Sequence, residues 1–370
     1  MAIPRILQLP GRPVWVHVIS RCVRKAYLCG EREGKWDHRR QWVEDRLGEL
    51  AGIFAVEVAA YAVMSNHVHA VVRMSPGGAA AWSEREVVER WLAVFGKNAD
   101  RMAVNGQRDP IIAQLAQDAA WVAERRARLA DLSWFMRAFK EPIARRANAE
   151  EDCSGRFWEG RFTSVPLLDH AAIVACMAYV DLNPVRARLA PTPEASCFTS
   201  VRARVEARQR HRVVTRVHAM VASGEALAEQ TEVILQRAGL DPATAQEAIA
   251  AAAVSAEAGG FLAPITRCQR THDDQILSSF ELSVDDYLSL VDLTGRVLRR
   301  DKRGAIDPHL RALLERLDLE LDAWVATMTG WRQMHGRGVG KRAARDAMAA
   351  HHGLRWIQNR CPLFVHRAAS

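Results

Sequence analysis

The spacing of apolar residues changes near residue 200, and this change constrains the fold more than any other feature of the sequence. Before it, stretches with a period of two are interleaved with stretches of helical spacing, and after it almost only helical spacing is found. Period two is typical of a β-strand and a period of 3.6 of an amphipathic helix. The sequence therefore predicts a mixed α+β domain over residues 1–204, followed by a mainly helical C-terminal domain over residues 205–370.

The order of the expected elements defines the first domain further. We expect strands at 14–23, 54–63, 68–72 and 157–165, with helices at 37–50, 132–148 and 169–183. The strands at 54–63 and 68–72 form a hairpin, and residues 79–130 form a polar helical insertion. The order strand, helix, two strands, helix, strand, helix is typical of an antiparallel sheet with helices packed on one face.

The second domain is expected to contain helices behind Asp241-Pro242 and at 284–299, 308–329 and 341–352. It also holds most of three basic stretches, at 202–216, 296–303 and 332–345. Such stretches can contact nucleic-acid phosphates, although most runs of charge are simply solvated. An accessory role in DNA binding is therefore one interpretation of this domain.

Composition excludes several classes of protein. With 49% apolar and 25% charged residues, the chain can bury a core and is not intrinsically disordered. Its longest strongly apolar run, at 248–256, is too short to cross a bilayer, and the first residues lack the apolar core of a signal peptide. The seven cysteines include no Cys-x-x-Cys pair. We therefore expect a soluble cytoplasmic protein with reduced thiols and no membrane partner.

The basic residues favour a nucleic-acid partner. The net charge is +8, from 51 basic and 43 acidic residues, and most of the basic residues are arginines. The planar guanidinium group holds phosphate through two parallel hydrogen bonds and stacks on bases. Genomic base composition can also enrich arginine, so the bias alone identifies no partner.

The pair His67 and His69 lies at the start of a predicted strand. Side chains two residues apart share a face of a strand, so both imidazoles point the same way while Val68 faces the core. Two neutral ring nitrogens on a rigid strand suit a divalent metal ion. A His-x-His pair by itself can equally be structural.

Tyr179 and Asn183 are the second pair with a chemical interpretation. They are four residues apart on the helix expected at 169–183 and therefore lie one above the other, beside the buried stripe of that helix. The Tyr179 hydroxyl and the Asn183 amide oxygen are thus expected to project from the same side of this helix. The alternatives are a packing tyrosine and an asparagine at a helix end before Pro184.

Taken together, these motifs resemble a known family. Asn66-His67-Val68-His69 at the head of a strand, with Tyr179 to Ala187 more than a hundred residues later, resembles the single-tyrosine HUH transposases. The likeness is greatest to their REP-associated tyrosine transposase branch. Leu9-Pro10-Gly11 and the segment from Gly155 to Phe162 add further matches, and the resemblance covers about residues 4–204.

The resemblance implies a fold, a reaction and roles for particular residues. It implies a ferredoxin-like sheet, a Mg²⁺ or Mn²⁺ ion held by His67, His69 and Asn183, and Tyr179 as nucleophile. The implied reaction cleaves and rejoins single-stranded DNA through a 5′-phosphotyrosine, at hairpin or palindromic repeat ends. The expected partner is single-stranded or hairpin DNA, and a homodimer is left open. Candidate DNA contacts are Arg156, Trp158, Arg161, Arg186 and Arg188.

Two other interpretations remain open at this point. The first is a DNA-binding regulator that keeps the fold without catalysis. The second is a His-x-His metallohydrolase of another fold, which needs further His or Asp ligands on later strands and predicts that Tyr179 is dispensable.

Overall fold

The computed structural model of the chain describes residues 14–30, 36–96, 108–223, 260–265, 282–298, 307–331, 338–358 and 360–364. The chain divides into two compact units. The first consists of Met1–Val58, Val63–Leu168 and Gly336–Gln358, and the second of Ala59–Ala62, Asp169–His335 and Asn359–Ser370. These bounds differ from the domain boundary expected after residue 204. Leu9-Pro10-Gly11 and the helix expected behind Asp241-Pro242 lie outside the described residues.

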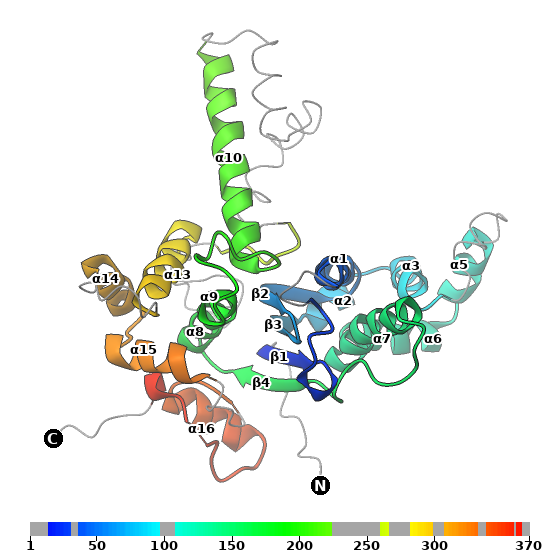
Figure 1. The fold of residues 1–370 in the computed structure, drawn as a ribbon. Helices are drawn as coiled ribbons and strands as arrows, with labels where there is room; N and C mark the ends of the chain where they lie inside the picture. The colour runs from blue at the N-terminus through cyan, green and yellow to red at the C-terminus, as the bar shows by residue number, and fades with distance from the viewer. Residues whose placement is uncertain are drawn as a thin grey trace. The chain divides into compact units, whose positions relative to one another are not determined.

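A four-stranded sheet contains all the named strands of the described chain. The strands are β1 (Trp15–Arg21), β2 (Val56–Met64), β3 (His67–Met74) and β4 (Thr163–Leu167), in the spatial order β2-β3-β1-β4. β1 pairs antiparallel with β3 on one side and with β4 on the other. The expected α+β class with an antiparallel sheet is thus confirmed (Figure 1).

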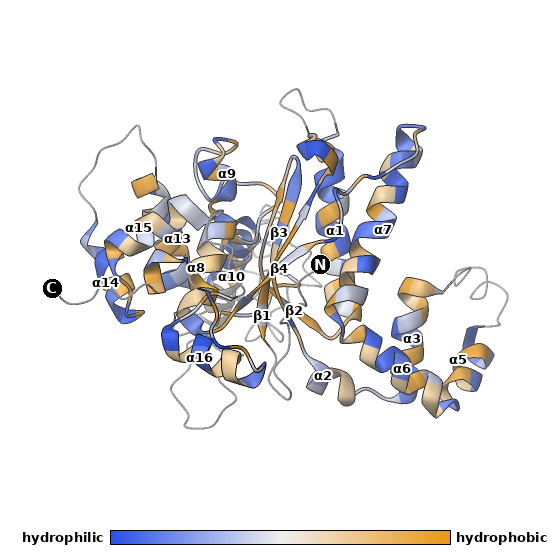
Figure 2. Cartoon of the chain, turned by 90° about the horizontal axis from the view of Figure 1, so that it is seen from below, coloured by the Kyte–Doolittle hydropathy of each residue, from blue (hydrophilic) through white to orange (hydrophobic). Residues whose placement is uncertain are grey.

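The period of two in the sequence is clearest in β1 and β3. In β1 and β3 the even-numbered residues Val16, Val18, Val68 and Val72 are apolar and buried. The odd-numbered residues point to the other face, and they include His17, His67 and His69. In Figure 2 the strands are largely coloured as hydrophobic, as expected for a sheet buried on both faces. The sheet therefore holds its polar side chains in a buried layer.

The main helices of the first unit are α1 (His38–Ile53) and α7 (Leu132–Glu150), which pack against each other. α7 begins at the N-cap Asp131, whose carboxylate accepts hydrogen bonds from the backbone N–H groups of Ser133 at 2.8 Å and Trp134 at 3.0 Å. Both helices alternate hydrophobic and hydrophilic faces in Figure 2. Their apolar faces supply core residues, among them Val43, Leu47, Phe135, Phe139 and Ile143.

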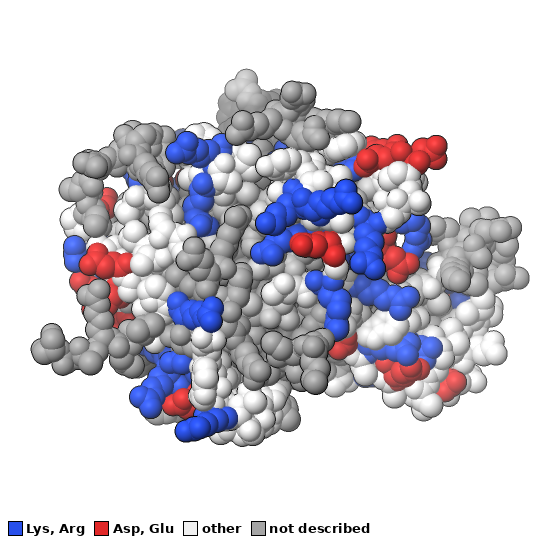
Figure 3. All heavy atoms as spheres, turned by 60° about the horizontal axis from the view of Figure 1, so that its bottom comes forward, with Lys and Arg blue, Asp and Glu red and all other residues white. Residues whose placement is uncertain are grey.

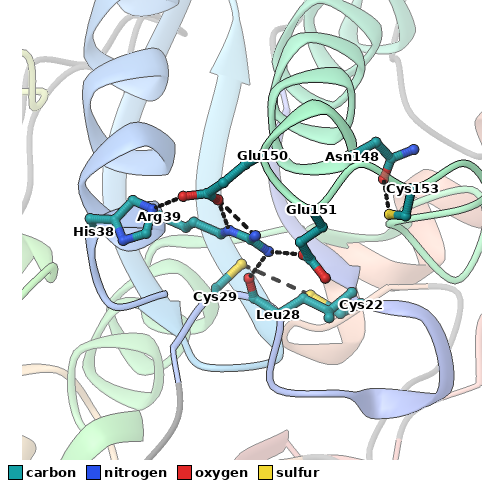
Figure 4. Close-up of polar contacts among 9 residues, drawn as sticks. All are labelled: Cys22, Leu28, Cys29, His38, Arg39, Asn148, Glu150, Glu151 and Cys153. Atoms are coloured by element: carbon teal, nitrogen blue, oxygen red, sulfur yellow. Dashed lines mark hydrogen bonds and ion pairs between the residues drawn. The ribbon is translucent and has the colours of Figure 1, made fainter. Parts of the chain in front are cut away.

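A buried arginine ties these two helices to the loop after β1. The side chain of Arg39 is fully buried and forms ion pairs with Glu150 at 2.7 Å and Glu151 at 2.6 Å (Figure 4). It also donates a hydrogen bond to the Leu28 carbonyl at 3.2 Å. That loop contains the short helix η1 (Val23–Lys25). Because a buried charge without partners is costly, these contacts fix the loop against α1 and α7.

The described part of the insertion expected at 79–130 is mainly helical. It contains α2 (Pro76–Ala80), α3 (Glu84–Phe95), α5 (Arg108–Ala116) and α6 (Ala119–Leu129). α3 opens with a capping box between Ser83 and Glu86. Figure 1 shows α3, α5 and α6 grouped together beside α7.

A C-terminal segment completes the first unit. Residue Val339 forms a parallel bridge with Leu167 at the edge of β4, with backbone hydrogen bonds of 2.8 and 2.9 Å. The following helix α16 (Arg342–His351) buries Met348 and Ala349 against Leu168 and Val14. The edge of β4 is thereby paired rather than left open.

In the described part of the second unit, the regular elements other than residues 59–62 of β2 are helices. Its elements are α8 (His170–Asp181), α9 (Asn183–Arg186), α10 (Ser200–Ala222), α13 (Val284–Leu298), α14 (Pro308–Arg316), α15 (Leu321–Gly330) and η3 (Pro362–Phe364). α8 is buried over nearly its whole length, from Ala171 to Asp181. α13 packs on α8, α10, α14 and α15. The described helices after residue 200 fit the helical spacing of the sequence.

Three elements differ from the sequence expectation. The helix expected at 169–183 ends at Asp181, and Asn183 begins the separate helix α9. The strand expected at 157–165 starts only at Thr163, because the residues before it bend after a single antiparallel bridge between Trp158 and Cys22. The helix expected at 308–329 is broken into α14 and α15, because Asp318 adopts a positive φ of 56°. Residues with positive φ end a right-handed helix.

Candidate functional site

His67 and His69 lie side by side on β3, as the strand pattern predicts. Their ring centroids are 4.8 Å apart and the rings meet edge to face. His67 is 8% exposed and His69 3% exposed, so both imidazoles are held within the protein. The strand pairs Arg21 with His67 and Ile19 with His69, which fixes the face on which the rings stand.

The neighbour Asn66 determines which nitrogen of His67 carries the proton. The amide Nδ2 of Asn66 donates to the Lys25 carbonyl at 3.1 Å, so its Oδ1 is the atom that faces His67 Nδ1 at 2.6 Å. An amide oxygen can only accept, and Nδ1 of His67 must therefore donate. In the neutral ring this leaves the lone pair on Nε2, which is the form that binds a metal ion.

His17, which the sequence reasoning missed, contacts the second histidine. Its Nε2 lies 2.9 Å from Nδ1 of His69, and the two rings stack with centroids 5.0 Å apart. His17 is completely buried on β1. The sequence could have shown only which face of the first strand His17 occupies. The strand register is what brings His17 next to His69.

Tyr179 and Asn183 both belong to the second unit. α8 begins at the N-cap Asp169, whose carboxylate accepts from the Ala172 N–H at 2.9 Å. Tyr179 lies in its last turn, and Asn183 opens α9 ahead of Pro184. Asn183 is 3% exposed, and its Nδ2 has no hydrogen-bond partner among the described residues. A buried amide of this kind can turn its oxygen toward a ligand.

The Tyr179 side chain is fully buried between two groups that the sequence reasoning did not connect with it. The Trp331 ring stacks on the Tyr179 ring with centroids 5.3 Å apart and an interplanar angle of 23°. The guanidinium carbon of Arg186 lies 4.7 Å from the centre of the same ring, and Arg186 also donates to the Thr329 carbonyl at 3.2 Å. A ring so covered needs a local movement before its oxygen can reach a large substrate.

A buried carboxylate anchors the helix that carries Tyr179. Asp181 accepts hydrogen bonds from the Ser200 hydroxyl, from the Val201 N–H at 2.9 Å and from the Tyr287 hydroxyl at 2.5 Å. Burial raises the pKa of Asp181 to about 6, although these hydrogen bonds and the charge of Arg204 oppose the rise. Asp181 thus joins α8 to α10 and α13.

The predicted ligands are divided between the two units. His67 and His69 belong to the first, whereas Tyr179 and Asn183 belong to the second. The structure brings together the two histidines, and separately it brings together Tyr179 and its covering groups. That all four side chains share one cation remains a prediction.

The predicted DNA contacts differ in exposure. Arg156, Arg161 and Arg188 are exposed, and within the described chain none of them forms an ion pair. Trp158 is buried and donates from Nε1 to the Lys140 carbonyl at 2.9 Å, so its ring belongs to the core of the first unit. Contact of these residues with DNA remains a prediction.

Many of the other arginines are neutralised within the protein. Arg202 pairs with Glu206, Arg208 with Asp285, and Arg296 with Asp292. On the face shown in Figure 3, acidic side chains lie among the basic ones. The exposed unpaired arginines near α9 and before β4 are therefore the better candidates for phosphate contacts.

The two imidazoles are suitable ligands for a divalent metal ion, but two ligands alone do not make a complete binding site. In the described chain, no group of three His, Cys, Asp or Glu side chains is placed to hold a metal ion. Those four residue types do not include an amide ligand such as Asn183.

Comparison with known proteins gives limited additional information. No family model and no curated protein matches the chain. One solved structure, described as a REP-associated tyrosine transposase bound to a REP hairpin, is similar over 55% of this chain and 86% of its own. The sequence identity is 12% and the TM-score 0.33, which is too low to support an argument about function. None of the helices described is long and apolar enough to cross a membrane.

Proposed function

We propose that this chain is a metal-dependent transposase that cleaves and rejoins single-stranded DNA, at hairpin or palindromic repeat ends. The observation that carries the proposal is the histidine pair on β3, in which Asn66 fixes His67 as a metal-binding tautomer. The motif around Tyr179 supplies the second half of the argument through its family resemblance. A ferredoxin-like arrangement of the sheet belongs to the same proposal.

In the proposed reaction the Tyr179 oxygen attacks a DNA phosphorus atom. The phenol of Tyr179 gives up its proton, the bond between phosphorus and the 3′-oxygen breaks, the 3′-oxygen takes up a proton to leave as a hydroxyl, and a 5′-phosphotyrosine forms. Rejoining is the reverse attack, so no nucleotide triphosphate is consumed. A Mg²⁺ or Mn²⁺ ion held by His67, His69 and Asn183 would polarise the phosphate and stabilise the leaving oxygen. Arg186 and Arg188 follow the tyrosine helix and would hold phosphates.

The burial of Tyr179 adds a requirement to this proposal. Its phenol must be uncovered before attack, and Trp331 and Arg186 are two of the groups that cover its ring. The same burial favours a second candidate, a non-catalytic regulator that binds DNA on the same fold. The two candidates make opposite predictions for covalent capture.

The test incubates the full chain with labelled single-stranded and hairpin oligonucleotides and Mn²⁺. We expect an adduct that survives denaturing electrophoresis and is lost in Tyr179→Phe and His67→Ala. The matched control is Tyr27→Phe, because Tyr27 is 59% exposed and lies outside the proposed site. An equal yield from Tyr179→Phe would refute the nucleophile, and hairpin binding without any adduct would favour the regulator.

A further inference from the structure

We propose that His17 is a positioning residue that holds His69 in the tautomer able to bind a cation. The inference rests on the proposed function, because this tautomer matters chemically only if His69 is a metal ligand. It adds a role for a residue outside the His-x-His pair. His17 would act through His69 and would not touch substrate.

The contact between the His17 and His69 rings is buried, and both residues lie on paired strands of the sheet. Nε2 of His17 and Nδ1 of His69 are 2.9 Å apart, and their residues are 0% and 3% exposed. Water therefore cannot easily replace either partner. His17 sits on β1, which is paired on both sides, and the register places it diagonally opposite His69 on the same face of the sheet.

When both rings are neutral, a hydrogen bond between two ring nitrogens permits only two arrangements. In one, Nδ1–H of His69 donates to the bare Nε2 of His17, and Nε2 of His69 keeps its lone pair. In the other, His17 donates and the proton of His69 moves to Nε2, which then cannot bind a cation. Only the first arrangement is compatible with His69 as a ligand through Nε2. His17 would therefore serve His69 as Asn66 serves His67.

Two substitutions separate this role from simple packing. His17→Phe keeps a flat buried ring but removes the acceptor, whereas His17→Gln offers an amide oxygen near the place of Nε2. The matched control is His309→Phe, an exposed histidine at the start of α14. Outer partners of metal-binding histidines typically change affinity by about 10- to 100-fold. We expect a loss of that size in Mn²⁺ affinity for His17→Phe and a largely restored affinity for His17→Gln.

Two measurements are made on the full chain. Titration calorimetry gives the Mn²⁺ affinity, and long-range ¹H–¹⁵N correlation spectra of the metal-free protein give the tautomer of each imidazole. We expect His69 to carry its proton on Nδ1 in the wild type and to become a mixture in His17→Phe. Heat denaturation verifies that each variant is folded. If His17→Phe is not folded, the tautomer of His69 in the wild-type protein decides the test.

Every outcome decides the question. An unchanged tautomer and a Mn²⁺ affinity within twofold of the wild type in His17→Phe would overturn the proposal. So would a wild-type His69 protonated on Nε2. If the wild type binds no Mn²⁺, the metal dependence of the proposed function fails, and the tautomer spectra still decide whether His17 orients His69.

Discussion

Replacing Asp181 by alanine tests whether its buried carboxylate joins the helix of Tyr179 to the rest of the second unit. The carboxylate accepts three hydrogen bonds, from Ser200, Val201 and Tyr287. Asp181→Ala leaves all three donors buried, and Tyr287 is only 1% exposed. Removing one partner from a buried charged network costs about 3–5 kcal/mol. We expect a loss of that size in the free energy of unfolding of this unit.

Hydrogen exchange measured by mass spectrometry is the suitable assay, since the two compact units need not unfold together. A loss of 3–5 kcal/mol corresponds to a fall of roughly 100- to 4,000-fold in the protection of amides that exchange by opening of this unit. The fall should include peptides from α8, α10 and α13, and it should spare α1 and α7. These two helices belong to the other compact unit.

Two companion variants show whether the carboxylate acts through the hydrogen bonds described. Tyr287→Phe removes the hydroxyl donor, and the new side chain needs no hydrogen-bond partner. We therefore expect the free energy of unfolding to fall by only about 1–2 kcal/mol. The double variant with Asp181→Ala should lose less than the sum of the two, because the contact is shared. A loss below about 1 kcal/mol in Asp181→Ala, or additive losses in the double variant, would refute the reasoning.

Two further predictions concern surface charges. The hydrogen bond from Arg316 lowers the pKa of Asp286 to about 2 from its ordinary 3.8, so the stability it contributes is present above pH 3.8 and is lost as the pH falls toward 2. Because Arg316 is 39% exposed, we discount this contribution to about 1 kcal/mol. Chemical denaturation should show Asp286→Asn less stable by that amount at pH 7, with the difference shrinking as the pH falls through 2, and a pH-independent difference would contradict it. Arg188→Ala should weaken binding of hairpin DNA and lower the slope of log affinity against log salt by about 1, measured by fluorescence anisotropy. An unchanged slope would exclude a phosphate contact for Arg188.

The sequence patterns succeed where the signal is local. The hairpin of β2 and β3 follows from two β-prone runs around Ser65-Asn66, and α8 follows from the N-cap Asp169 and its helical spacing. The prediction that His67 and His69 share one face of the sheet required only the two-residue repeat of a β-strand. The break between α14 and α15 was missed, because Asp318 is not a residue whose positive φ can be anticipated from its neighbours.

The amino-acid sequence alone determined the α+β class with an antiparallel sheet, and it is the source of the proposal that His67, His69, Tyr179 and Asn183 carry metal and nucleophile chemistry. Only the tertiary structure decided what surrounds them: His17 against His69, Trp331 on Tyr179, and Asp181 bonded to Tyr287. The physical reason is that the two kinds of feature depend on residues at very different separations along the chain. Periodicity and capping depend on neighbours within a few residues, whereas these contacts join side chains 52 to 152 positions apart through strand register and helix packing.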